Sequence, residues 1–141
     1  MPKSVLFVCN MNSVRSPMAA AILADSAKGA VRVDSAGVYE GGLDPFVEGV
    51  LDEVGMSLGG YEPKAVTDTP LETFDLVIAL TPEAAAEIRR RLPRERLEYW
   101  PIDNPSDVRG GREALLDAYR AVRDDLRARI RARFPALDQK P

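Results

Sequence analysis

Three pairs of residues in this chain place Ser, Asp or Thr directly before proline, each where an apolar run gives way to a helical pattern. The pairs are Ser16-Pro17, Asp44-Pro45 and Thr81-Pro82. Ser, Thr and Asp are favoured helix caps, and proline is favoured at the first helical position. The pairs therefore predict three helix starts that follow strands. Such alternation is typical of a parallel sheet with helices on both faces.

The expected elements follow one another without repeats, low-complexity segments or an internal linker. Apolar, β-branched runs predict strands at residues 4–8, 30–35, 75–80 and 97–100. Helices are expected to start at residue 17, at 44–45, at 81 and at about 112. Gly55 is expected to end the second helix, and a short helix is one option at Thr69-Pro70. The last helix should run to about residue 133, with an apolar stripe formed by Leu115, Tyr119, Val122, Leu126 and Ile130.

Cys9 is the only cysteine, and five residues separate it from Arg15. A thiol at the end of a strand, a short polar loop, an arginine and a helix start together make an anion site with a nucleophile at its floor. The helix dipole favours thiolate over thiol, and the planar guanidinium can hold two oxygens of an oxyanion. A lone cysteine after an apolar strand is more often buried and inert. The arginine spacing and the Ser16-Pro17 helix start favour a phosphate-handling site instead.

The composition of the chain argues against several classes of protein and of catalytic site. A chain of 141 residues with net charge −3 fits a single domain, residues 1–141, and argues against a general nucleic-acid or membrane-surface binder. One cysteine excludes an intramolecular disulfide, and the absence of histidine eliminates Cys-His catalytic pairs and argues against a zinc site. The start of the chain has no signal-peptide layout, and no apolar run is long enough to span a bilayer. A cytoplasmic protein without metal or cofactor is therefore expected.

Several motifs together resemble the low-molecular-weight protein tyrosine phosphatase family, which includes arginine phosphatases and thioredoxin-coupled arsenate reductases. The resemblance extends over nearly the whole chain, from about Ser4 to Phe134, and the matching residues are Val5–Cys9, Asn12, Arg15–Ala19, Asp34–Gly37, Phe74–Ile78 and Trp100–Pro105. The resemblance implies a three-layer α/β fold with a four-stranded parallel sheet in the order 2-1-3-4. It also implies a phosphate loop after the first strand and a general acid in the loop after the fourth.

The resemblance gives each loop residue an expected role. Cys9 is the nucleophile and Arg15 binds the phosphate oxygens. In the family, the asparagine that matches Asn12 braces the loop, and the serine that matches Ser16 steadies the thiolate. Without the resemblance, Ser16 is only a helix cap and Asn12 a residue that tolerates a left-handed turn. The remaining loop positions expected to contact substrate are Asn10, Met11, Ser13 and Val14.

Two loop positions depart from the usual family pattern. Met11 stands where a glycine is usual, and Val14 stands where many members carry a second cysteine. Thioredoxin-coupled arsenate reduction needs further thiols to pass a disulfide outward. The chain has none beyond Cys9, which argues against a self-contained arsenate reductase.

Ser13 and Tyr39 bear on the choice of substrate. In the family, a bulky aliphatic residue at the position of Ser13 goes with phosphotyrosine, and a small hydroxyl residue goes with phosphoarginine. Ser13 therefore favours a polar floor for a guanidinium, with a plain turn serine as the alternative. Tyr39 is either an aromatic wall beside the pocket or an ordinary loop residue.

The strongest departure lies in the stretch from Trp100 to Pro105. Family members usually carry an aspartate directly before this proline, where it protonates the leaving oxygen. Asn104 occupies that place, and an amide has no dissociable proton to give. Asp103 precedes it and Asp107 follows the proline, so a small loop shift could bring either carboxyl into range. Turn formation alone also explains Asp103.

The sequence therefore predicts a cysteine-dependent phosphomonoester hydrolase with Cys9, Arg15 and Asp103 as its catalytic residues. Its partners are a phosphorylated protein or a small phosphomonoester, and inorganic oxyanions, with no nucleic acid or membrane. Asn104 and Tyr39 complete the expected substrate contacts. Two other functions stay open: a phosphate-binding module with weak turnover, and an arsenate reductase that relies on external thiols.

Overall fold

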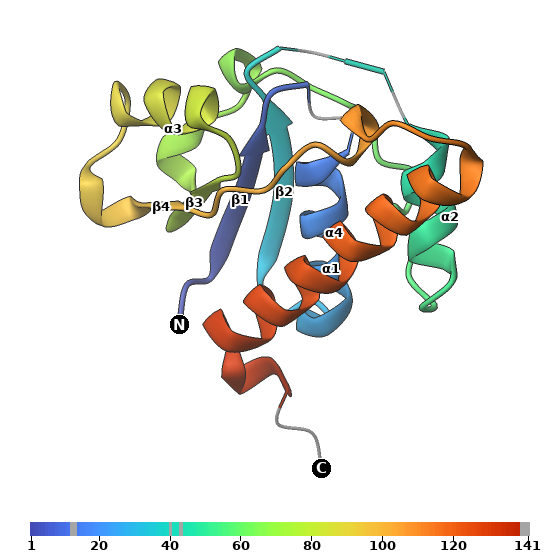
Figure 1. Cartoon of the computed structure of the whole chain (residues 1–141). Helices are drawn as coiled ribbons and strands as arrows, with labels where there is room; N and C mark the ends of the chain where they lie inside the picture. The colour runs from blue at the N-terminus through green and yellow to red at the C-terminus, as the bar shows by residue number, and fades with distance from the viewer. Residues whose placement is uncertain (12–13, 40, 43, 139–141) are drawn as a thin grey trace.

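Four parallel strands form one sheet in the order β2-β1-β3-β4 (Figure 1). The computed structural model describes residues 1–11, 14–39, 41–42 and 44–138. The strands are β1 (Ser4–Cys9), β2 (Arg32–Gly37), β3 (Leu76–Ala79) and β4 (Leu97–Tyr99). The predicted fold class and strand order are confirmed.

Three helices lie between successive parallel strands, and a fourth follows the last strand. They are α1 (Arg15–Ala27), α2 (Pro45–Asp52), α3 (Pro82–Arg89) and α4 (Arg112–Arg133). Short 3₁₀ turns occur at η1 (Val66–Asp68), η2 (Leu71–Thr73), η3 (Arg94–Arg96), η4 (Pro105–Asp107) and η5 (Pro135–Asp138). In the described part of the chain, no helix combines the length and the apolar composition that a membrane crossing requires.

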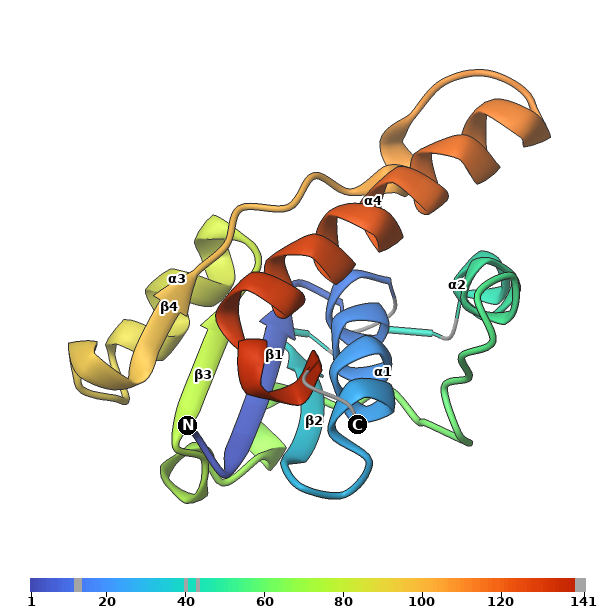
Figure 2. The same ribbon diagram turned by 90° about the horizontal axis from the view of Figure 1, so that it is seen from below.

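The side chains of β1 alternate between two cores. Val5 and Phe7 pack on the face covered by α1 and α4, whereas Leu6 and Val8 pack on the face covered by α3. Figure 2 shows α1 and α4 side by side across the first of these faces. Because β1 is central and buried on both faces, its residues from Val5 to Cys9 are apolar. The end of this rigid strand carries Cys9.

Two of the three predicted caps are confirmed. Asp44 accepts a hydrogen bond from the Phe46 amide at 2.8 Å, and Thr81 accepts one from the Ala84 amide at 3.0 Å. The third is wrong, because α1 begins at Arg15 and Ser16 lies inside the helix, fully buried. Among the residues that the structure describes, no side chain caps α1.

Most other differences from the predicted elements are shifts at their ends. β2 begins two residues later than expected, because it pairs with β1 from Ser4 opposite Arg32 to Cys9 opposite Gly37. Thr69 and Pro70 lie between η1 and η2 rather than in a helix. Gly55 follows α2 with a φ of +75°, and the Met56 amide bonds the Leu51 carbonyl at 2.9 Å, the geometry of a glycine helix end.

The stripe predicted on α4 is confirmed only in part. Tyr119, Leu126 and Ile130 are buried, whereas Leu115 and Val122 are half-buried. Arg123 is buried beside them because its guanidinium donates to the Val50 carbonyl at 2.9 Å and to Glu53 at 2.8 Å. The hydrogen bonds replace the water that a buried guanidinium would lose.

Candidate active site

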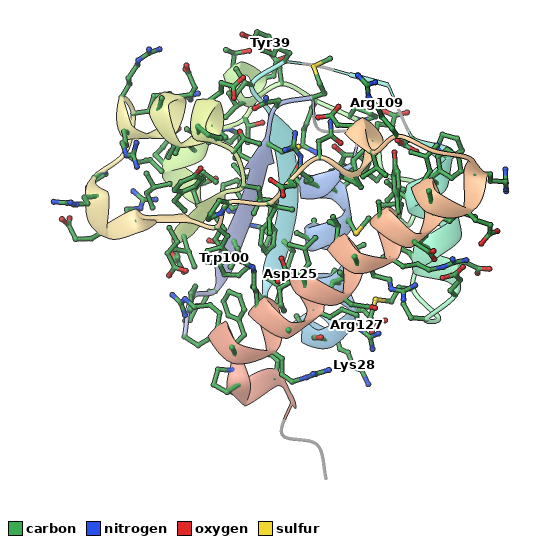
Figure 3. The ribbon with its side chains drawn as sticks, viewed as in Figure 1. Lys28, Tyr39, Trp100, Arg109, Asp125 and Arg127 are labelled. Atoms are coloured by element: carbon green, nitrogen blue, oxygen red, sulfur yellow. The ribbon has the colours of Figure 1, made fainter. Side chains whose placement is uncertain are left out.

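Cys9 and Asn10 are held by the chain that leaves β2. The Val38 amide donates to the Cys9 carbonyl at 2.9 Å, and the Tyr39 amide donates to the Asn10 carbonyl at 2.7 Å. The ladder between β1 and β2 therefore continues into the loop after β1. Figure 3 places Tyr39 at this end of the sheet and Lys28 at the opposite end. The loop thus starts from a fixed backbone at the carboxyl edge of the sheet.

The Cys9 sulfur contacts α1 directly. Its Sγ lies 3.0 Å from Ser16 Oγ, and the Ser16 hydroxyl is also 3.3 Å from the Ala36 carbonyl, to which it can donate. When Cys9 is a thiol, it can donate to Ser16 while Ser16 donates to Ala36. When Cys9 is a thiolate, the single hydroxyl proton can turn toward sulfur. The arrangement therefore accommodates both protonation states without moving a heavy atom.

The side chain of Arg15 is held from the other side of the site. Its Nη1 donates to the Ile102 carbonyl at 3.0 Å, and the side chain is half-buried. Ile102 belongs to the loop after β4, so this bond connects the start of α1 to the predicted acid loop. A guanidinium carries five N–H donors, and one such bond leaves others for an oxyanion.

A hollow of about 390 Å³ opens between these two loops. It brings together four of the residues predicted from sequence, namely Asn10, Arg15, Asp103 and Asn104, and it also includes Asp107. The rest of its wall is mostly apolar and consists of Leu80, Pro82, Tyr99, Pro101 and Ile102. Both candidate acids therefore face the same space as Arg15.

Asn10 connects the loop to the start of α3. Its Oδ1 accepts from Thr81 Oγ1 at 2.6 Å, and its Nδ2 donates to Glu83 Oε2 at 3.0 Å. Thr81 is itself the cap of α3. Both polar ends of the Asn10 side chain are thus engaged with neighbouring protein groups, although the residue lines the hollow. The sequence did not predict this connection, since Asn10 and Thr81 are far apart in the chain.

Asn104 caps the short turn η4. Its Oδ1 accepts both from the Ser106 amide at 3.1 Å and from Ser106 Oγ at 2.8 Å. These bonds fix the orientation of the amide, because only the oxygen can accept from two donors. The Nδ2 group is therefore the end of Asn104 that remains to donate toward a ligand in the hollow. Asp103 and Asp107 are exposed on either side of it.

The remaining residues predicted to contact the substrate are Val14, Tyr39, Met11, Asn12 and Ser13. Val14 is buried in the core between the sheet and α1, which accounts for its apolar character. Tyr39 is 59% exposed and does not line the hollow beside Arg15. Met11 is exposed, and a Cβ at Gly41 would come within 2.6 Å of the Met11 carbonyl oxygen, so this glycine permits a close approach of the two segments. Asn12 and Ser13 lie outside the described residues.

Tyr99 is the aromatic residue that the sequence reasoning missed. It ends β4, is 40% exposed and lines the hollow together with Arg15. Its position at the carboxyl end of a parallel strand was the available signal, because ligands bind at that edge. Pro82 reaches the hollow for the same reason, since it follows β3.

Tyr61 is another aromatic residue whose electrostatics connect it to Cys9. Burial is the main cause that raises the pKa of Tyr61, and the charges of Cys9 and Asp34 act in the same direction. Lys64 forms an ion pair with Asp34 at 2.7 Å and lies 5.2 Å from the Tyr61 ring. The phenol therefore stays protonated beside the site at neutral pH.

Comparison with known proteins places this geometry in a family. A family model described as "Low molecular weight phosphotyrosine protein phosphatase" matches residues 4–141. The chain is 29% identical over 129 residues to the arsenate reductase of Bacillus subtilis, covering 92% of this chain and 93% of the relative. It is 30% identical over 138 residues to the protein-arginine-phosphatase of Geobacillus stearothermophilus, with 92% and 93% covered. It is 39% identical over 97 residues, or 61% of each chain, to the low molecular weight protein-tyrosine-phosphatase YfkJ of Bacillus subtilis.

Solved structures show the same fold. The tyrosine phosphatase AmsI of Erwinia amylovora superposes with a TM-score of 0.81 at 23% identity, over 99% of this chain and 95% of that one. A YwlE mutant from Bacillus subtilis superposes with a TM-score of 0.78 at 25% identity, over 96% and 99%.

Proposed function

We propose, given that the chain belongs to the low molecular weight phosphotyrosine protein phosphatase family, that it is a cysteine-dependent phosphomonoester hydrolase. The observation that carries the proposal is the contact of the Cys9 sulfur with Ser16 at the start of α1, one residue from Arg15. A nucleophile and a planar cation thus meet at the amino end of a helix, where backbone N–H groups favour an anion. We also propose that residues 1–141 act as one cytoplasmic domain.

In the proposed first step, the Cys9 thiolate attacks phosphorus in line with the leaving group. The S–P bond forms as the P–O bond breaks, and the leaving oxygen takes a proton. Arg15 and the loop amides stabilise the three equatorial oxygens, whose charge is greatest in the transition state. In the second step, water attacks the cysteinyl phosphate, which releases inorganic phosphate and restores the thiolate.

We assign the general acid to Asp103, with Asp107 as the alternative. Both line the hollow with Arg15, and a carboxylic acid can give the leaving oxygen the proton that Asn104 cannot. The same carboxylate would then activate water in the second step. The role of Asn104 would be to donate a hydrogen bond from Nδ2 to the bound oxyanion or leaving group.

The substrate class is a phosphorylated protein or a small phosphomonoester. Ser13 favours phosphoarginine over phosphotyrosine, and the similarity to a protein-arginine-phosphatase supports testing both. The similarity to arsenate reductases supports testing arsenate as well. Reduction of arsenate to arsenite takes two electrons, and Cys9 is the only cysteine. That activity would therefore need an external thiol such as glutathione or glutaredoxin.

A specific observation favours a second candidate function. Asn104 replaces the usual acid and uses its oxygen to cap η4. A protein that keeps the anion cradle without an acid would bind phosphate or a phosphorylated residue and turn it over slowly. The loss of general acid catalysis is typically worth about 10²–10⁴ in rate.

One experiment separates these functions. Turnover of an activated aryl phosphate is measured for the wild type and for Cys9→Ser, and vanadate binding is measured for both proteins. The hydrolase proposal expects wild-type turnover that Cys9→Ser abolishes, with oxyanion binding retained. Comparable turnover in Cys9→Ser would exclude the cysteine mechanism. Tight vanadate binding by a wild type that hydrolyses no phosphomonoester would favour the binding module. Arsenate reduction is assayed with and without glutathione. Reduction only with the added thiol would favour an arsenate reductase that relies on external thiols.

A further inference from the structure

The hollow beside Arg15 has a neighbour along β4. A second hollow of about 350 Å³ is lined by Arg89, Leu92, Arg94, Leu97 and Tyr99. Tyr99 lines both hollows, so the two hollows adjoin at this residue. In Figure 1, α3 and β4 lie together at the edge of the sheet, away from α2. We call this second hollow the β4 hollow.

The β4 hollow combines an apolar floor with a basic rim. Leu92 is buried and Leu97 is half-buried, whereas Arg89 and Arg94 are exposed. Leu97 and Tyr99 are two residues apart on one strand, so their side chains share a face. Apolar contacts at the floor and cations at the rim fit a ligand that carries both aliphatic and acidic side chains.

Arg89 and Arg94 differ from the neighbouring arginines because no described residue pairs with their charges. Five arginines occur between residues 89 and 96. Arg90 pairs with Glu87 at 3.2 Å. Arg91 donates to the Val66 and Thr69 carbonyls, and Arg96 donates to the Glu72 and Phe74 carbonyls. Arg89 and Arg94 have no ion pair or hydrogen bond with any described residue, so both guanidinium groups remain to bind an acidic partner.

The spacing along β4 suits an extended peptide. A strand advances about 3.3 Å per residue, so Tyr99 and Leu97 lie roughly 7 Å apart along it. A peptide whose phosphorylated residue occupies the hollow of Arg15 and Asp103 would pass Tyr99. Its side chains two to four positions from the phosphorylated residue would then lie over the β4 hollow.

We propose that the β4 hollow binds acidic side chains that flank the phosphorylated residue of a protein substrate, with Arg89 and Arg94 as their partners. The inference rests on the proposed phosphatase function and names its substrate more closely: an acidic segment of a phosphoprotein rather than a free phosphomonoester. Tyr99 separates the phosphate subsite from this flanking subsite.

The test compares kcat/KM for phosphotyrosine peptides that differ only in their flanks. One set carries glutamates two to four positions before the phosphotyrosine, another carries them after it, and a third carries glutamines in their place. An aryl phosphate without flanks is the fourth substrate. The variant is Arg89→Gln/Arg94→Gln, and the matched control is Arg90→Gln, which removes a neighbouring exposed charge that is already paired with Glu87.

The wild type is expected to prefer at least one acidic peptide over its glutamine counterpart. The double variant should lose about three- to tenfold in kcat/KM on that peptide, as two exposed ion pairs would predict. Its activity on the aryl phosphate should not change, and Arg90→Gln should resemble the wild type. Raising the salt concentration should remove the preference.

An equal loss on the glutamine peptide or on the aryl phosphate would overturn the proposal, because it would reveal a general effect on the site. Equal wild-type rates on acidic and neutral peptides would overturn it too, while leaving the phosphatase function intact. Absence of turnover on every substrate, including the aryl phosphate, would reject both proposals together. Melting temperatures of the variants establish that each is folded.

Discussion

The Cys9 sulfur and the Ser16 hydroxyl oxygen are 3.0 Å apart, which fits the role that the family resemblance gave Ser16 and not its role as a helix cap. The helix begins at Arg15, two residues earlier than predicted, so Ser16 lies within its first turn with its hydroxyl against the sulfur. Ser16 thus contacts the proposed nucleophile from within the helix. The contact gives Ser16 a chemical role that can be measured.

Ser16→Ala should make Cys9 react more slowly as a nucleophile. The variant loses a hydroxyl that can donate to the charged sulfur, and hydrogen bonds to charged groups contribute roughly 1.5–3 kcal/mol. Alkylation of Cys9 by iodoacetamide near pH 6 should therefore slow by about tenfold or more. Ser26→Ala, at the other end of α1, is the control. An unchanged alkylation rate in Ser16→Ala would show that the serine has only a packing role.

Arg15→Lys should lose most of the turnover despite keeping the charge. A lysine presents a point charge and cannot hold two equatorial oxygens in one plane. It would also be a poorer donor to the Ile102 carbonyl, which Arg15 bonds at 3.0 Å. The fall in kcat on an aryl phosphate should be about 10²–10³-fold, the effect typical of removing an oxyanion donor. Activity within threefold of the wild type would argue against the assignment.

Asp103→Asn should slow substrates with poor leaving groups far more than an activated aryl phosphate. Only the poor leaving groups need the proton, and the alkaline limb of the pH–rate profile should disappear with it. Asp107→Asn is the matched variant, since Asp107 lines the same hollow. If neither variant changes the ratio of the two rates, the acid has been lost. In that case Asn104→Asp should raise turnover toward the ~10²–10⁴ expected of a positioned acid.

Ser13→Ile should shift substrate preference from phosphoarginine to phosphotyrosine. A serine hydroxyl can hydrogen-bond a guanidinium, whereas an isoleucine offers an apolar contact to an aromatic ring. The ratio of kcat/KM values for a phosphoarginine and a phosphotyrosine peptide is the measurement. An identical ratio in wild type and variant would mean that Ser13 is only a turn residue.

Glu53→Gln should destabilise the fold at neutral pH but not near pH 2. Hydrogen bonds from Arg120 and Arg123 lower the pKa of Glu53 from 4.5 to about 2. A carboxyl whose pKa is lowered on folding contributes stability above its unfolded pKa and loses it as the pH falls through the folded value. The difference between wild type and variant in urea unfolding should therefore be full above pH 4.5 and vanish toward pH 2. Glu95→Gln, at an exposed residue of η3, is the control for the loss of a surface carboxylate.

Short sequence patterns predicted much of the fold because helix caps and strand patterns depend on interactions between neighbouring residues. Asp44 and Thr81 act as caps within three residues of their own position, so their neighbours sufficed to identify them. Arg123 was not predicted to be buried, because its burial depends on Val50 and Glu53 some seventy positions away. Position on a helical stripe does not reveal such partners.

The sequence by itself determined the order of strands and helices along the chain. It also placed Cys9 and Arg15, the proposed nucleophile and its arginine, in one short stretch of chain. Only the tertiary structure decided what surrounds them. Asn10 bonds Thr81, Arg15 bonds the Ile102 carbonyl, and Tyr99 joins the hollow at the end of β4. These contacts join residues that are distant in the chain, and they form because parallel strands bring their carboxyl ends to one edge of the sheet.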